Sequence, residues 1–202
     1  MFPYNPKGQK IKTDAGVLCA RAFLAHFQVA ALLATVASAT GIHAAITCSA
    51  TLVTTVTTNI TNPSVPRNIT AMAGGTAGDI KAVQVLITGT DFNDKVITES
   101  LPAFTVDTAG IVTGSKAFKT ITSISIPAMD GAGATVAIGF GEKLGLPFKL
   151  ANNTVLKTYF DSVLEATAPT VTVSPTAIES NTVDLNSALN SKVVDVYLIV
   201  GY

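Results

Sequence analysis

The chain has few of the residues on which most enzymes and metalloproteins depend. Its 202 residues include no tryptophan, two histidines and two cysteines, and only 13% are charged, against about a quarter in ordinary soluble domains. Cys19 and Cys48 form no CxxC pair and have no persuasive zinc-ligand spacing to His26 and His43. Buried free thiols are the simpler interpretation, and a disulfide between the two is the alternative. We expect no metal and no cofactor.

The charge is balanced as well as sparse. Thirteen basic residues match thirteen acidic ones, so the formal net charge is zero. A chain of this composition has no long-range field to attract nucleic acid or an anionic membrane surface. The composition therefore argues against nucleic-acid binding.

Motifs for nucleotide binding and hydrolysis are incomplete. The run Gly74–Lys81 contains three glycines but lacks the Gly-Lys-Ser/Thr ending of a phosphate loop, and it leads into a strand-like stretch. A serine hydrolase triad would have to use His26 or His43, and no Gly-x-Ser-x-Gly elbow is present. We therefore expect no catalytic residues and predict that the protein is not an enzyme.

Three polar residues in one short segment raise the question of calcium. Asp91, Asn93 and Asp94 offer oxygen ligands, but the EF-hand pattern is absent. Aspartate and asparagine are also common turn residues, because their side chains bond to backbone groups nearby. We interpret the segment as a turn.

Threonine, alanine, valine and isoleucine dominate what is present, and they favour β structure. The runs 80–88 and 95–101 alternate apolar and polar residues and predict an antiparallel hairpin. Similar runs recur at 119–127 and 134–140, and the apolar run 193–200 predicts a central strand. We predict a mainly β protein, an antiparallel β-sandwich or jelly-roll-like barrel, with an apolar N-terminal arm or helix.

The N-terminal third has a different character. Residues 1–14 lack periodicity and indicate an extended arm, whereas residues 15–45 are rich in alanine and other apolar residues. Arg21, His26 and Gln28 interrupt this stretch, which argues against a signal peptide and against a membrane span. The stretch is therefore expected to be either a helix that ends at Gly41 or, in part, an extended strand. We expect two parts, residues 1–45 and a β domain of residues 46–202.

So apolar a segment needs a covering surface. Burial contributes roughly 25 cal/mol per Å² of apolar area, far more than scattered surface charges would. We therefore expect the segment to form an interface through Val17, Leu18, Phe23, Leu24, Phe27, Leu32 and Leu33.

Several stretches of the β domain together resemble a known group of proteins. They are 61–70, the glycine-rich turn, 79–85, 97–104 and 139–147. Across residues 41–202 the chain is similar to virion structural proteins of tailed bacteriophages of Gram-positive hosts. The family offers no catalytic residues to carry over to this chain.

The resemblance implies a particle component. We expect a capsid decoration, or cement, protein that is made in the host cytoplasm, forms a homo-oligomer, with a trimer favoured, and binds the major capsid protein on the outside of the phage head. A tail, neck or collar location is the alternative, and a glycan-binding β module for host recognition is a further one. Neither nucleic acid nor a membrane is an expected partner.

Overall fold

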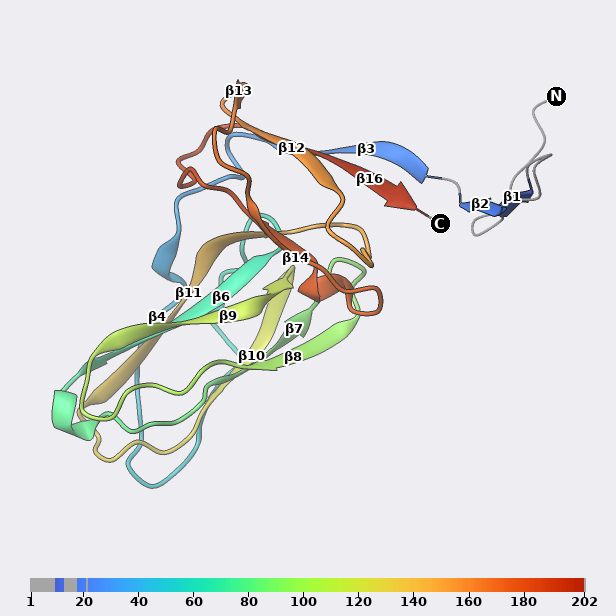
Figure 1. Ribbon diagram of the computed structural model, residues 1–202. Helices are drawn as coiled ribbons and strands as arrows, with labels where there is room; N and C mark the ends of the chain where they lie inside the picture. The colour runs from blue at the N-terminus through green and yellow to red at the C-terminus, as the bar shows by residue number, and fades with distance from the viewer. Residues whose placement is uncertain (1–9, 13–17, 21, 202) are drawn as a thin grey trace.

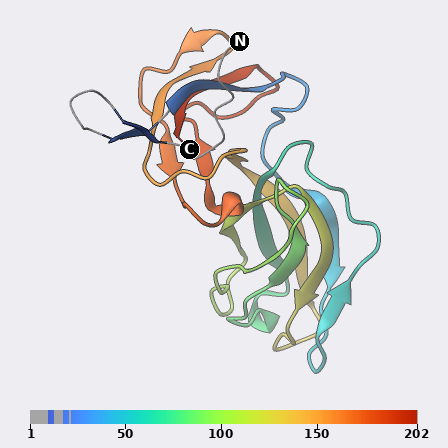
Figure 2. The same ribbon diagram turned by 90° about the vertical axis from the view of Figure 1, so that its right-hand side faces the viewer.

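The computed structural model describes residues 10–12, 18–20 and 22–201, and it is mainly β, as predicted. Two short 3-10 turns, η1 (Ala77–Asp79) and η2 (Ile178–Ser180), are the helical elements among the described residues. The strands pair in antiparallel fashion in three larger sheets and one short hairpin (Figures 1 and 2).

Two of the sheets form the main sandwich (Figure 1). The first has the strand order β5 (Thr54–Val56), β10 (Thr120–Ile126), β7 (Leu86–Thr90) and β8 (Val96–Ser100). The second has the order β14 (Thr170–Thr172), β15 (Thr182–Asp184), β11 (Ala134–Gly145), β6 (Arg67–Gly75) and β9 (Gly110–Phe118), with β4 (Ser38–Thr47) also paired to β11.

The first hydrophobic core lies in the main sandwich and follows from the alternation in its strands. Strand β10 buries Ile121, Ile124 and Ile126, and a register shift between Ile121 and Ser123 changes which positions face inward. One extra residue in a strand turns the following side chains to the other face. The bulge therefore explains why isoleucines spaced by three and then by two all reach the same core.

The predicted hairpin is confirmed as β7 and β8, which pair directly. Strand β7 begins at Leu86 and not at residue 80. Residues 80–85 nonetheless run beside 101–107, because Val83 and Val85 accept backbone hydrogen bonds from Phe104 and Leu101. Ile80 and Val85 are fully buried. The apolar pattern of residues 80–85 therefore identified core residues correctly, although these residues do not form a regular strand.

The third sheet, here called the upper sheet, has the order β13 (Val163–Leu164), β12 (Val155–Phe160), β16 (Val194–Gly201) and β3 (Ala22–Val29) (Figure 1). The C-terminal strand β16 is central, as predicted. A second core lies beneath this sheet and includes Leu144 at the far end of β11. Strand β11 thus contributes to both cores.

Residues 22–47 form two strands joined by a turn, and not a helix. Strand β3 pairs with β16 over all eight of its residues, and β4 pairs with β11. The predicted helix end at Gly41 is wrong: Gly41 lies inside β4, where a Cβ would meet the Phe140 ring at 2.5 Å. The expected division after residue 45 falls inside β4.

Close strand contact also explains Gly139. It lies inside β11, and a Cβ there would overlap the Ser38 carbonyl oxygen. The glycine therefore allows β4 to approach β11, and β11 continues through it.

A short hairpin precedes β3. Strands β1 (Lys10–Lys12) and β2 (Leu18–Ala20) pair with Lys10 opposite Ala20. Figure 1 shows this hairpin apart from the three sheets, next to the first residues of β3 and close to the C-terminus.

Candidate functional site

The candidate catalytic and metal residues of the sequence do not come together. Within residues 22–201, no group of three or more His, Cys, Asp or Glu side chains is arranged to hold a metal ion. His26 lies on β3 in the upper sheet, whereas His43 lies on β4 in the main sandwich. His43 Nδ1 lies 2.7 Å from the carbonyl oxygen of Ala44. Neither histidine has a serine hydroxyl among its described hydrogen-bond partners.

The acidic residues near the turn segment and the glycine-rich run accept hydrogen bonds from backbone N–H groups. Asp91 Oδ1 accepts hydrogen bonds from the N–H groups of Asn93 and Lys95, so this segment is the turn that the sequence predicted. Asp79, after the glycine-rich run, accepts a hydrogen bond from Gly133 N–H and joins two loops of the main sandwich.

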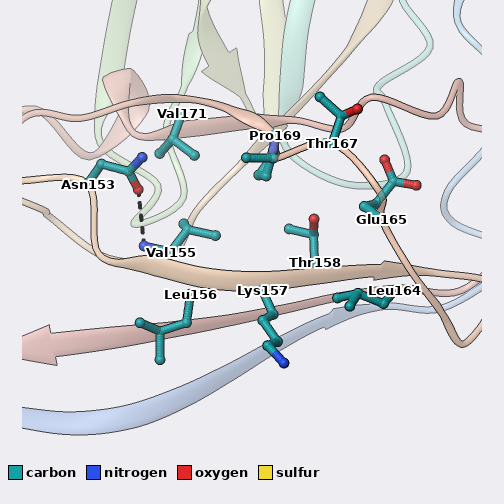
Figure 3. Close-up of a pocket in the computed structure, with 11 residues that line it drawn as sticks. Asn153, Val155, Leu156, Lys157, Thr158, Leu164, Glu165, Thr167, Pro169 and Val171 are labelled. Carbon is teal, nitrogen blue, oxygen red and sulfur yellow. Dashed lines mark hydrogen bonds between the residues drawn. The ribbon is translucent and has the colours of Figure 1, made fainter.

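A pocket of about 260 Å³ lies between β12 and the segment 164–171 (Figure 3). Val155 and Thr158 point into it from β12, and Pro169, Thr167 and Val171 face them from the other side (Figure 3). Its volume is at the low end for a small-molecule site.

The polar groups of this pocket do not form a catalytic pair. Glu165 accepts two hydrogen bonds from Ser187, one from its N–H and one from its hydroxyl. Asn153 Oδ1 accepts the Val155 N–H (Figure 3). The Thr158 hydroxyl is buried and makes no hydrogen bond with the described residues. The pocket therefore has mainly apolar walls and no charged pair arranged for catalysis.

A more open hollow of about 530 Å³ lies beside β11, and Asn68, Glu142, Lys143 and Asp184 help to line it. Burial raises the pKa of the Asp184 carboxyl group, and Lys143 opposes that shift. Asn68 is already satisfied, because it donates to the carbonyl of Gly114 and accepts the N–H of Lys143.

The upper sheet has a polar and aromatic cluster on its outer face, the face turned away from the second core. Asp195 Oδ1 lies 2.7 Å from His26 Nε2 and accepts a hydrogen bond from the Gln28 side chain. The His26 and Tyr197 rings stack with centroids 4.6 Å apart, and Tyr159 meets Tyr197 edge-on. Cross-strand pairing places His26 directly opposite Tyr197.

Exposed apolar side chains concentrate near the same sheet. Five of the fifteen large exposed apolar residues of the described chain lie in one short segment, which we call the apolar strip: Phe23, Leu24, Leu32, Leu33 and Val36. Leu24 is 67% exposed and Leu32 is 86% exposed. The strip begins on β3 and continues through the turn after it.

The strip includes four of the residues that the sequence suggested for an interface. Phe23, Leu24, Leu32 and Leu33 are exposed, whereas Phe27 packs against the second core. Val17 lies outside the described residues, and Leu18 belongs to β2.

One notable residue had no signal in the sequence analysis. Arg67 is fully buried at the start of β6, donates to the Thr35 carbonyl at 2.7 Å and lies over the Phe140 ring. Its Nε and Nη2 have no hydrogen-bond partner among the described residues. Burial lowers the pKa of Arg67 to about 10, against the opposing effect of Glu142. Arg67 ties the segment between β3 and β4 to the main sandwich.

Comparison with known proteins returned no match to a protein-family model, a curated protein or a solved structure. Within the described residues, no helix has the length and hydropathy needed to cross a membrane.

Proposed function

We propose that this protein is a structural component of a tailed-bacteriophage particle, a decoration protein that binds the outside of the head and stabilises the shell. The virion assignment comes from the sequence resemblance over residues 41–202. The described residues add one supporting feature, the exposed apolar strip.

The apolar strip is the observation that carries the proposal of association. Contiguous apolar patches mark binding surfaces, whereas single exposed apolar residues are normal. Five large exposed apolar side chains within residues 23–36 make this segment the candidate for such a surface. Covering a leucine side chain contributes about 1.5–3 kcal/mol. Leu24, Leu32 and Leu33 together would then contribute several kcal/mol to docking.

Immunogold labelling of the phage particle that contains this protein tests the location. Label distributed over the whole head supports the decoration role. Label restricted to the tail or neck would replace it with the tail, neck or collar alternative, and unlabelled particles would contradict both locations. Particles of a phage that lacks the gene are the control for antibody specificity.

The stabilising role needs a separate measurement. Heads without the protein should release DNA at a lower temperature than complete heads, and adding the purified full-length chain should restore the release temperature. Unchanged DNA release after head binding would separate attachment from stabilisation.

A second candidate function, glycan binding, is favoured by the cluster on the outer face of the upper sheet. His26, Tyr159 and Tyr197 provide rings, while Asp195 and Gln28 provide hydrogen-bonding groups. A glycan array probed with the full chain tests this candidate, and Tyr197→Ala is the variant that removes a ring from the cluster. Val96→Ala, on β8 and far from the cluster, is the control. Binding that is lost in Tyr197→Ala alone would support this candidate, and an array without binding would reject it.

A further inference from the structure

The hollow beside β11 has the size of a ligand site. Its volume is about 530 Å³, and small-molecule sites typically have about 300–1,000 Å³. Five strands of the main sandwich line it, through Ser38 on β4, Thr70 on β6, Thr113 on β9, Lys143 on β11 and Asp184 on β15. Sites built on strands are held more precisely than sites on loops. The hollow is therefore formed before any ligand arrives.

One wall of the hollow is fixed by hydrogen bonds. Asn68 is 1% exposed, and its side chain donates to the Gly114 carbonyl and accepts the Lys143 N–H. Gly141 lies against it, because a Cβ at Gly141 would come within 2.6 Å of the Asn68 side-chain amide. The glycine thus leaves room for the amide, and the amide holds the backbone of β11 in place.

Four other polar side chains of the hollow have no partner. Thr70 is 8% exposed, and its hydroxyl makes no hydrogen bond with a described residue. Glu142, Lys143 and Asp184 are half-buried, and their side chains form no hydrogen bond or ion pair with the described residues. Polar groups that have lost part of their water are costly until something else pairs with them. The four groups together therefore favour a ligand that supplies hydrogen bonds.

The charges around the hollow restrict what this ligand is. The carboxylates of Glu142 and Asp184 repel an anion such as phosphate, whereas the ammonium group of Lys143 opposes a cation. Among the described residues, no group of three or more His, Cys, Asp or Glu side chains is arranged to hold a metal ion. A purely apolar ligand would bury the charged groups without pairing them. A neutral, polar ligand is the class that remains.

Hydroxyl groups match these walls best. A carboxylate only accepts hydrogen bonds and an ammonium group only donates them, but a hydroxyl does both. Ligand hydroxyls are thus able to donate to Glu142 and Asp184 and to accept from Lys143. Ile111, which is 55% exposed, and Phe140 also line the hollow and provide apolar area for C–H groups. A sugar ring combines several hydroxyls with such C–H groups.

We propose that the hollow beside β11 binds a neutral polyhydroxyl compound, such as a sugar residue that is free or at the end of a glycan. The site differs from the cluster of His26, Tyr159 and Tyr197, which lies on the upper sheet. The proposal does not rest on the decoration role, so a failure of either leaves the other standing.

Amide chemical-shift mapping on the isotope-labelled full-length chain tests the proposal. The probes are glucose, galactose, mannose and N-acetylglucosamine, disaccharides that end in these sugars, and methylammonium. At least one sugar should bind with a Kd of about 1 mM and shift the amides of Thr70, Thr113 and Lys143. Binding of the disaccharides alone would assign the site to a glycan end. No sugar binding, binding of methylammonium alone, or shifts confined to the surroundings of His26 and Tyr197 would overturn the proposal.

Substitutions in the hollow provide the second test. Glu142→Gln and Asp184→Asn should each weaken sugar binding about tenfold, because each removes a charged acceptor. Thr113→Trp should abolish binding, since the larger side chain fills a hollow that the exposed Thr113 lines. Asp130→Asn, at an exposed carboxylate outside the hollow, and Tyr197→Ala should leave binding unchanged.

The amide spectrum of each variant shows whether its fold is intact, and affinities are compared among the folded variants. Full binding in folded Thr113→Trp would overturn the proposal. Equal losses in Asp184→Asn and Asp130→Asn would overturn it as well, because the loss would then not depend on the hollow.

Discussion

The Glu99 carboxylate closes one seam of the sandwich by accepting hydrogen bonds from Ser115, from its N–H at 2.7 Å and from its hydroxyl at 2.9 Å. Glu99 lies on β8 at the edge of one sheet, and Ser115 lies on β9 at the edge of the other. A buried carboxylate thus replaces backbone pairing between two edge strands.

Replacing this carboxylate should destabilise the fold. Glu99→Ala should lower the free energy of unfolding by about 2 kcal/mol, because the partly buried N–H groups of Ser115 and Lys116 lose their acceptor. Glu99→Gln should cost less, since one acceptor oxygen remains. Urea denaturation measures both. Asp130→Ala is the control, as its ion pair with Lys81 is exposed and worth about 0–1 kcal/mol; equal losses at Glu99 and Asp130 would contradict the seam.

Asn181 should be among the least replaceable polar residues. It is fully buried, its Oδ1 accepts the N–H groups of Leu150 and Ser174, and its Nδ2 donates to the carbonyls of Ser174 and Ala177. Asn181→Ala should cost about 3 kcal/mol, and Asn181→Asp a similar amount, because a carboxylate would face two carbonyl oxygens. Thermal unfolding measures the loss. Exposed Asn190→Ala should change little, and matching effects would contradict this role.

The stability of the wild-type protein relative to Arg67→Met should depend on pH. The folded pKa of Arg67, about 10, lies below the ordinary pKa of an arginine, so the unfolded chain holds this proton more tightly. The cost of burying the charge is present in full below about pH 10 and is relieved as the pH rises above it. Between about pH 9 and pH 11, the free energy of unfolding of the wild type should therefore rise by about 1 kcal/mol relative to that of Arg67→Met. Denaturant titrations at each pH measure this difference, and a constant difference would contradict the shift.

Cys48 should be unreactive in the native protein. It is buried, and burial raises the pKa of its thiol, so little thiolate is present to react. In a Cys19→Ser background, an aromatic disulfide reagent should modify Cys48 slowly in buffer and fast in denaturant. Modification at equal rates in both conditions would show that the site opens readily.

Thr158→Val should leave the stability unchanged or raise it by about 1 kcal/mol. The change keeps the shape of a buried side chain and removes a hydroxyl without a described partner. Thermal unfolding measures the effect. Thr182→Val makes the same change at another buried threonine, on β15, and its effect on stability is the comparison. A clear loss of stability in Thr158→Val would mean that its hydroxyl is hydrogen-bonded in solution.

Several strands were predictable from local pattern. In the main sandwich, alternation identified β7 and β8, because a two-residue period reports which face is buried. In the upper sheet, the continuous apolar run at the end of the chain identified β16 as a central strand. The pattern was weaker for β12, where a register shift between Val155 and Lys157 interrupts the alternation.

The candidate sites were less predictable. Arg67, Glu99 and Asn181 looked ordinary in the sequence, since their importance depends on partners 16 to 32 residues away or across a turn. The cluster of His26, Tyr197 and Asp195 joins residues from near opposite ends of the chain. No local pattern reports such a contact.

The sequence by itself determined that the chain forms β-sheets with little charge, because composition and short-range alternation act on each strand alone. Only the tertiary structure decided that the apolar segment after the arm is a strand and not a helix. Strand β3 pairs with β16, whose residues are more than 160 positions away, and Phe27 and Val29 pack on the second core, to which β11 and β16 both contribute.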